Sequence, residues 1–473
     1  MAKFNRKKVL RQLEFKRKWR SYSRYVYIAV PCVLCCLLCL YFAYSKFFVS
    51  EEQAVIRTTV GDFIYGDVVI GAYIDGQYSS AIPGKNDGYA VEKVVCDNGA
   101  VGEWNNDGWG LLTTNLSKRT KCNVYFKKYS ITDKIAELAQ SDTVNFASDD
   151  PDNNIRYIGA NPDNYVYFNC SDYNNQSDST CEKWRIIGLF NNIIKSDGTK
   201  ENLIKIIRDE ALGNIAWDFK KNSVGSSTED FGSNDWSDSQ LMMMLNPVDY
   251  LKSGYTNSND IISYNNQELY SKMGSYYNGT KGCKPAEIAK GETFNCTEID
   301  FTTTGLKNDN TRNAIENVVW NLGGTASYYS SSNGLASHWY GYERGTTVYS
   351  GRPTIWTGKI GLMYPSDYGY ATSGGQTRDR ATCLANALYD WYDSSISDCT
   401  SNDYLFKSSY HQWTLAPGSS LAYDVLVAYS RGTVFGRDAN NSYGVRPALF
   451  LKSSISISGG TGSSKEPYQL KVN

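Results

Sequence analysis

Short apolar runs separated by turn signals mark the region from residue 54 to residue 128. Apolar and polar residues alternate, or β-branched residues cluster, in residues 54–60, 68–74, 89–95 and 122–126. This period of two is typical of half-buried strands. The pairs Asp75-Gly76, Asp87-Gly88 and Asn98-Gly99 favour tight turns beside these runs. The pattern predicts a small β module over residues 55–128, with Trp104 and Trp109 in its core or, alternatively, stacking on a sugar.

A larger domain is predicted from residue 165 to residue 452. Strand composition recurs at residues 165–170, 184–190, 203–208, 359–364, 424–429 and 443–451. Residues 253–310 are rich in Asn, Ser, Tyr and Gly and read as an insertion, and residues 453–473 read as a polar tail. Strands dispersed among a few helices, without strict alternation, predict the fold class α+β.

Three helices are predicted from apolar residues at helical spacing. The first covers residues 131–140, with Thr132 as its cap, inside a linker over residues 129–164. The second follows Ser237, which could cap it, and ends before Pro247. The third covers residues 311–322 and ends at Gly323.

Residues 25–44 contain no charged side chain and are long enough for a helix that crosses a bilayer. Ten Lys and Arg residues and one acid precede them in residues 1–24. Basic flanks stay in the cytoplasm, so the sequence predicts a transmembrane signal-anchor over residues 25–45, with the lipid bilayer as partner and the bulk of the chain outside. Two alternatives remain open: a secretory signal cleaved after Ser45, and a buried helix of a soluble core.

Charge and cysteine use agree with an extracytoplasmic location. From Tyr25 onward the net charge is about −10, which disfavours nucleic acid as a partner. Four cysteines lie within the apolar stretch of residues 25–44. They could serve simply as small apolar side chains, or they could have a role in helix packing or lipidation. Eight others form four neighbouring pairs in sequence, which predicts disulfides. These are Cys96 and Cys122, Cys170 and Cys181, Cys283 and Cys296, and Cys383 and Cys399.

A metal site is a weaker interpretation of the cysteines, and of a group of acids and amides elsewhere in the chain. None of the eight cysteines forms a C-x-x-C pair, and the chain has two histidines, so a zinc site is disfavoured. The acids and amides of residues 149–154 could offer oxygens to Ca²⁺, but their spacing is not that of an EF-hand loop, and such residues also form turns. We expect no metal and no cofactor.

Several landmarks together resemble a known family. They are Trp184-Arg-Ile-Ile187, Asn234-Asp-Trp-Ser237, the run from Ile360 to Tyr370, Trp413-Thr-Leu-Ala-Pro-Gly418 and Gly444-Val-Arg-Pro-Ala-Leu449. In this order they are similar to an uncharacterised domain family of bacterial exported proteins. That family resembles the C-type-lectin-like fold shared with formylglycine-generating enzymes and with variable receptor-binding proteins. The resemblance covers about residues 165–452.

The resemblance implies a fold more than an activity. The active-site cysteines of formylglycine-generating enzymes do not map onto this chain, and the Trp-Asn-Asp triplet of calcium-dependent lectins is not reproduced. In related folds the segment before the last strand forms the recognition surface. The resemblance therefore implies ligand-binding roles for Trp413, Arg431, Arg437, Asp438, Asn440 and Asn441.

The sequence thus predicts a cell-surface binding protein for a glycan or a protein. Its 37 tyrosines, with many Ser and Asn residues, suit adaptable binding surfaces, although codon usage in an AT-rich genome would produce the same composition. G-x-S-x-G, H-E-x-x-H, P-loop and G-x-G-x-x-G motifs are absent from the sequence. The alternatives are an extracytoplasmic oxidase or hydrolase on the same scaffold, and a structural envelope component.

Overall fold

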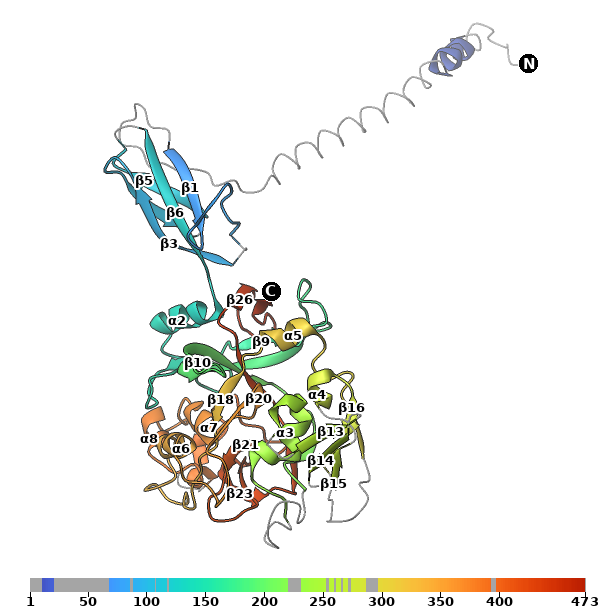
Figure 1. Ribbon diagram of the computed structural model, residues 1–473. Coiled ribbons are helices and arrows are strands. Elements are labelled where there is room, and N and C mark those ends of the chain that lie inside the picture. Colours follow the sequence, from blue (N-terminus) through green and yellow to red (C-terminus); the bar gives the residue numbers. More distant parts are fainter. Residues whose placement is uncertain are drawn as a thin grey trace, which may run out of the picture. The chain divides into compact units, whose positions relative to one another are not determined.

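The computed structural model describes residues 11–20, 68–85, 88–106, 108–116, 119–219, 231–251, 255–258, 261–264, 267–270, 274–285, 297–392 and 397–472 (Figure 1). Residues 11–20 form a helix. The chain divides into two compact units. The smaller unit comprises residues 1–85 and 91–126, and the larger unit comprises residues 86–90 and 127–473.

The smaller unit is built of strands, as the sequence predicts. Its strands are β1 (Val68–Ile74), β2 (Gln77–Ser79), β3 (Tyr89–Cys96), β4 (Val101–Asn105), β5 (Gly110–Thr114) and β6 (Thr120–Lys128). Four of them form a sheet in the order β2-β1-β6-β3, in which β1 and β6 run parallel. β4 and β5 form a separate hairpin. The disulfide Cys96–Cys122 joins β3 to β6.

Aromatic side chains fill the core of the smaller unit. Trp104 and Trp109 are each 9% exposed, and their rings meet edge to face at 5.5 Å. Phe126 packs against Trp104 at 5.2 Å, and the indole of Trp109 donates a 2.7 Å hydrogen bond to the Pro83 carbonyl. Both tryptophans therefore belong to the core, where edge-to-face pairs add to the free energy of burial.

Two sheets organise the larger unit. The first has the order β20-β25-β11-β10-β8-β7, with β9 also paired to β10, and the second has the order β12-β24-β21-β22-β23. The first sheet contains β7 (Phe146–Ala147), β8 (Ile155–Tyr157), β9 (Tyr165–Phe168), β10 (Glu182–Ile194), β11 (Lys200–Arg208), β20 (Ile360–Gly361) and β25 (Ala448–Leu451). The second contains β12 (Asn214–Ala216), β21 (Gln412–Pro417), β22 (Asp424–Ala428), β23 (Val434–Asp438) and β24 (Ser442–Gly444).

Short helices and small sheets surround these two sheets. The helices are α2 (Ile131–Ser141), α3 (Gln240–Leu245), α4 (Ser275–Asn278), α5 (Asp309–Ala314), α6 (Ala336–Glu343), α7 (Pro365–Tyr370) and α8 (Arg380–Leu384), with 3₁₀ turns η2 (Trp236–Asp238), η3 (Val248–Tyr250), η4 (Asp390–Tyr392) and η5 (Ser397–Cys399). One small sheet has three strands, β13 (Tyr255–Ser258), β14 (Ile261–Tyr264) and β15 (Gln267–Tyr270). Three others have two strands each: β16 (Lys281–Cys283) with β17 (Glu298–Asp300), β18 (Val318–Asn321) with β19 (Ile355–Gly358), and β26 (Ser456–Gly459) with β27 (Gln469–Lys471).

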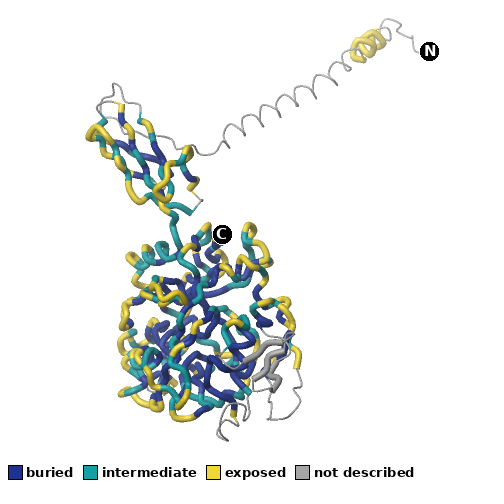
Figure 2. The backbone as a smooth tube through the Cα atoms, viewed as in Figure 1, coloured by how far each residue is buried: buried dark blue, intermediate teal, exposed yellow. Residues whose placement is uncertain are grey.

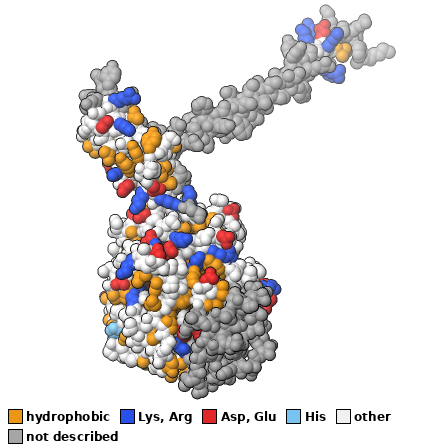
Figure 3. Space-filling model, in the orientation of Figure 1, with side chains coloured by type: hydrophobic (Ala, Val, Ile, Leu, Met, Phe, Trp, Pro, Cys, Tyr) orange, Lys and Arg blue, Asp and Glu red, His pale blue; other side chains and the backbone are white. Residues whose placement is uncertain are grey.

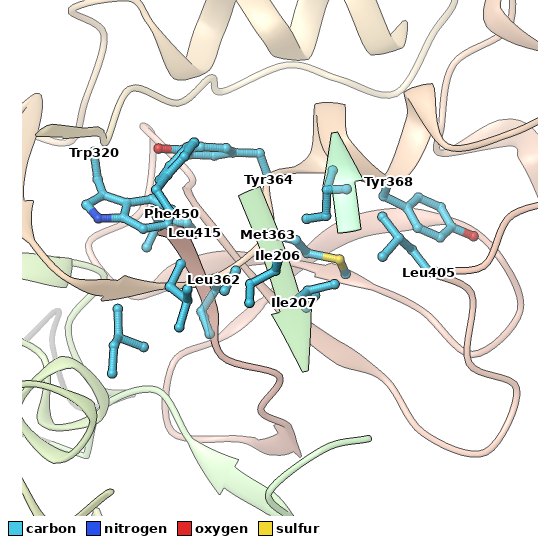
Figure 4. Packing of buried hydrophobic residues seen from close by; sticks show 14 of the residues in the cluster. Ile206, Ile207, Trp320, Leu362, Met363, Tyr364, Tyr368, Leu405, Leu415 and Phe450 are labelled. Carbon is cyan, nitrogen blue, oxygen red and sulfur yellow. The ribbon is translucent and has the colours of Figure 1, made fainter. Parts of the chain in front are cut away.

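One continuous apolar core lies inside the larger unit, where the backbone is largely buried (Figure 2). Figure 4 shows the rings of Trp320, Tyr364 and Phe450 close together, beside aliphatic side chains of β11 and β21. Trp320 and Phe450 have ring centroids 5.3 Å apart. Burial of each such ring contributes about 1.5–3 kcal/mol, so this core holds the sheets and helices in fixed positions around any surface site.

The predicted fold class, α+β with an N-terminal transmembrane helix, is wrong. Strands dominate the described residues and helices are few. Across those same ranges, no helix is both long and apolar enough to cross a bilayer. The predicted anchor over residues 25–45 lies outside the described residues. The sequence predicted too much helix, because the apolar residues of a short buried strand and of a short buried helix follow similar patterns.

The predicted helix over residues 311–322 shows this error directly. α5 ends at Ala314, and residues 318–321 form strand β18, paired with β19. Ile315, Val318 and Leu322 are buried, as the helical pattern required, but Val318 lies in β18, Ile315 forms an isolated bridge to Leu451, and Leu322 follows the strand. The consecutive β-branched residues Val318 and Val319 favour a strand, and the partner β19 completes its hydrogen bonds.

Helix caps and the C-terminal segment also differ from prediction. Ser130, rather than Thr132, caps α2 and accepts a hydrogen bond from the Asp133 amide. Ser239, rather than Ser237, caps α3. Residues 453–473, expected as a polar tail, contain β26 and β27, and Leu470 is fully buried. The predicted linker contributes β7 and β8 to the seven-stranded sheet.

Candidate functional site

Disulfides brace the described chain at three places. The bonded pairs are Cys96–Cys122, Cys170–Cys181 and Cys383–Cys399, in agreement with nearest-neighbour pairing. Cys283 is also disulfide-bonded, and its predicted partner Cys296 lies outside the described residues. Disulfides form and persist in oxidising compartments.

Trp413 lies in the core and not at a ligand surface. Its side chain is 1% exposed, and its indole donates a 2.8 Å hydrogen bond to the Ile215 carbonyl. The ring packs against Tyr443 at 4.9 Å and against Trp217 at 5.9 Å. Trp413 therefore supports the five-stranded sheet from inside and leaves no accessible face for a sugar.

The two predicted arginines lie against aromatic rings at the surface. Arg437, on β23, places its guanidinium 4.2 Å from the ring centre of Phe435 and 5.9 Å from that of Tyr429. Arg431, in the turn before β23, is exposed and stacks on Tyr392 at 5.1 Å. Cation–π contacts of this kind fix the long arginine side chains, and Arg431 also donates a 3.4 Å hydrogen bond through Nη1 to the Tyr392 hydroxyl.

Asp438, Asn440 and Asn441 shape the turn between β23 and β24. The side-chain amide of Asn441 donates a 3.0 Å hydrogen bond to the Asp438 carbonyl, and the Asn440 amide donates to the Phe231 carbonyl. All three side chains are half-buried. These three residues thus lie together with Arg437, but the side-chain amide of Asn441 stabilises the turn.

Aromatic side chains that the sequence did not indicate extend this region. Tyr329, Tyr389 and Tyr392 are 55%, 40% and 54% exposed. Tyr389 meets Tyr329 at 5.0 Å and Phe435 at 6.5 Å, so the rings form a continuous series. Only one signal could have pointed to two of them, because Tyr389 and Tyr392 lie between the paired Cys383 and Cys399.

We call this set the aromatic–arginine surface. Its members share half-exposed or exposed side chains in mutual contact around β22 and β23. They are Tyr329, Tyr389, Tyr392, His411, Tyr429, Arg431, Phe435, Arg437 and Tyr443. Elsewhere, hydrophobic side chains reach the visible face of the larger unit in small patches between polar ones (Figure 3).

The charged members of the aromatic–arginine surface are Arg431 and Arg437. His411 stacks on Tyr429 at 3.6 Å, and its Nδ1 accepts a 3.1 Å hydrogen bond from the Ser430 amide. Burial, together with the charges of Arg437 and Arg431, lowers the pKa of His411 below its ordinary value. A neutral imidazole between two guanidinium groups suits a partner that carries negative charge.

A second cluster of charge is fully buried under the seven-stranded sheet. Asp367 accepts from Lys205 at 2.5 Å and from Arg156 at 2.8 Å, and Arg156 also pairs with Asp150 at 2.6 Å. Although burial opposes ionisation, the charges of Lys205 and Arg156 lower the pKa of Asp367 to about 2. Because these side chains pair with one another and none is exposed, the cluster is a buried network of ion pairs with a structural role.

Within the described ranges, no group of three or more His, Cys, Asp or Glu side chains is arranged to hold a metal ion. The acids of residues 149–154 are used internally: Asp150 accepts from the Asn154 amide and from Arg156. Asp149 pairs with Arg380. These carboxylates therefore serve turns and ion pairs.

Comparison with protein-family models, with curated proteins and with solved structures finds no match for this chain. The resemblance to the C-type-lectin-like fold stays a prediction from the landmarks in the sequence.

Proposed function

We propose that the larger unit is a binding module that works in an oxidising compartment outside the cytoplasm. Its ligand contacts the aromatic–arginine surface and is a protein or a glycan that carries negative charge. The observation that supports this most is the continuous series of half-exposed rings on which Arg431 and Arg437 stack. Tyr and Arg are the residue types enriched where binding energy concentrates in interfaces.

Rigid support of the surface agrees with a binding role. Trp413 packs beneath Tyr443, and the Cys383–Cys399 bridge closes the segment that carries Tyr389 and Tyr392. Side chains that are already held in place lose little conformational entropy when a partner binds. The three described disulfides support an oxidising location.

The test is a screen of the full chain against glycan and protein arrays, followed by affinity measurements with two pairs of substitutions. Arg431→Ala with Arg437→Ala, and Tyr389→Ala with Tyr392→Ala, should each weaken binding by about 30-fold or more, as expected when central interface residues are truncated. Raising the salt concentration should weaken binding further, because exposed charges are screened.

Matched controls are Tyr78→Ala and Arg119→Ala, which remove an exposed ring and an exposed cation from the smaller unit. They should leave affinity unchanged. A ligand whose affinity all four surface substitutions leave intact would refute the proposal. Ordered self-association without a ligand would favour the structural alternative instead.

A further inference from the structure

One lysine and one aspartate of the larger unit lie in direct contact inside its core. Lys205, on β11, places Nζ 2.5 Å from Oδ2 of Asp367, which lies in the first turn of α7. Their side chains are 0% and 1% exposed. The two residues are 162 positions apart in the sequence, so only the fold brings them together. The pair shares no residue with the aromatic–arginine surface.

Aromatic rings surround the amine of Lys205. The ring centres around its Nζ are those of Tyr364 at 4.3 Å, Trp320 at 5.2 Å, and Phe190 and Phe450 at 5.7 Å each (Figure 4). Removal from water opposes the charged form of an amine, and burial lowers the pKa of Lys205 below its ordinary value. The surroundings therefore favour the neutral amine, which is the nucleophilic form of lysine.

The carboxyl group of Asp367 is held in one orientation beside this amine. Its Oδ1 accepts a 2.8 Å hydrogen bond from Arg156, and its Oδ2 accepts a 2.9 Å hydrogen bond from the Tyr364 amide. Because a C–O bond is about 1.2 Å long, Nζ of Lys205 lies no more than about 3.7 Å from the carboxyl carbon Cγ. Reacting atoms held at about 3–3.5 Å react far faster than the same groups free in solution.

The charges of the buried network stay balanced without this pair. Arg156 also binds Asp150 through Nε at 2.6 Å, so it keeps a carboxylate partner when Lys205 and Asp367 are both neutral. Two charges buried away from water cost free energy that a neutral amide does not. Water that could hydrolyse such an amide is excluded, because neither side chain is accessible. Burial therefore favours condensation of the two groups.

We propose that Lys205 and Asp367 condense into an intramolecular amide that crosslinks β11 to α7. A proton passes from the Lys205 ammonium to Oδ2 of Asp367, and the neutral Nζ attacks Cγ. The Nζ–Cγ bond forms, and the negative charge of the tetrahedral intermediate rests on Oδ1, where Arg156 stabilises it. A second proton moves from the nitrogen to Oδ2, the Cγ–Oδ2 bond breaks, and one molecule of water leaves.

The crosslink differs from the disulfides in its chemistry. Condensation changes no oxidation state, so the amide needs no oxidant and persists in the presence of a reductant. It closes a long stretch of chain between residues 205 and 367 and therefore restricts the unfolded state. The proposal is independent of the partner of the aromatic–arginine surface.

The test is mass spectrometry of the full chain after reduction and alkylation of its disulfides. The chain should be lighter by one molecule of water than its linear sequence, and proteolytic digestion should release a branched peptide that joins residue 205 to residue 367. Both measurements use the chain without substitutions, so they do not depend on a variant that folds. A chain of full mass, with both residues recovered in linear peptides, would overturn the proposal.

Two variants test the assignment of the crosslink. Lys205→Met removes the amine, while Asp367 keeps its pairing with Arg156, and it should restore the full mass. Thermal unfolding should show that this variant remains folded. The matched control is Lys183→Met, because Lys183 lies 3.0 Å from Asp178 in a pair that water reaches, and it should leave the loss of water unchanged. A loss of water that Lys205→Met leaves in place, or that Lys183→Met abolishes, would contradict the assignment.

Discussion

Arg446 shows how one buried side chain can join distant segments. Its guanidinium donates to the Arg208 carbonyl at 2.8 Å, to the Leu405 carbonyl at 3.1 Å and to the Gln412 side chain at 2.8 Å. It is 2% exposed. Only a planar group with several donors can make these bonds together, so a lysine would not replace it. These contacts give the arginine of the Gly-Val-Arg-Pro motif a structural role.

Asp403 is a buried carboxyl whose ionisation opposes folding. Its Oδ1 accepts a 2.7 Å hydrogen bond from the Phe406 amide, while its Oδ2 is buried without a hydrogen-bond partner among the described residues. Burial raises the pKa of Asp403 to about 7. The folded chain thus holds this proton at a pH where the unfolded chain has lost it, and stability falls as the pH rises from about 4 to 7.

We therefore expect Asp403→Asn to stabilise the protein above pH 7. Asparagine keeps the acceptor for the Phe406 amide and carries no charge. The free energy of unfolding at pH 8 should rise by about 1–4 kcal/mol, and at pH 4 it should change little. Denaturant unfolding at both pH values measures this.

The control for this prediction is Asp197→Asn, which neutralises an exposed acid. It should produce no comparable gain at pH 8. An equal effect of Asp403→Asn at both pH values would show that its ionisation does not set the pH dependence.

At the scale of elements, the Cys383–Cys399 bridge connects fold and surface. It joins α8 to η5 and links two cysteines 16 positions apart, with Tyr389 and Tyr392 between them. A loop of this length contributes about 3 kcal/mol through the entropy of the unfolded chain. Loss of the bridge should release this segment before the sheets unfold, because the sheets have their own core.

We expect Cys383→Ser with Cys399→Ser to weaken ligand binding at the aromatic–arginine surface by about 10-fold or more, because ordering the two tyrosines would then cost entropy on binding. Limited proteolysis should show earlier cleavage between residues 383 and 399. Removal of Cys170–Cys181 is the matched control, since its loop carries no residue of this surface. If both double variants weaken binding equally, the bridge has no local role.

At the scale of the whole molecule, the distribution of disulfides argues for an oxidising environment. Bridges occur in both units, with Cys96–Cys122 in the smaller one and Cys170–Cys181 and Cys383–Cys399 in the larger one. All six cysteines come after the basic residues at the start of the chain. A chain kept in a reducing compartment would lose these constraints in both units.

Protein isolated from its native host should therefore resist alkylation at these six cysteines until a reductant is added. Mass spectrometry of peptides labelled before and after reduction measures this. Cysteines in the apolar stretch from residue 25 to residue 44 serve as the internal comparison, because no bridge is predicted for them. Labelling of the six cysteines without reductant would contradict an oxidising location.

The sequence by itself determined the local features of this protein. Alternating apolar residues predicted β1, β3 and β11 within a few positions, because a two-residue period is visible in a short window. Neighbouring cysteines predicted the described disulfides, and the loop before the last strands directed attention to Arg431 and Arg437.

Only the tertiary structure decided which residues meet. Residues 318–321 became a strand because β19 lies beside them, and Trp413 became a core residue because Trp217 and Tyr443 cover it. Tyr329 joined the surface from far along the chain, and Lys205 came to lie against Asp367. Such contacts depend on long-range packing, which no local pattern of residues encodes.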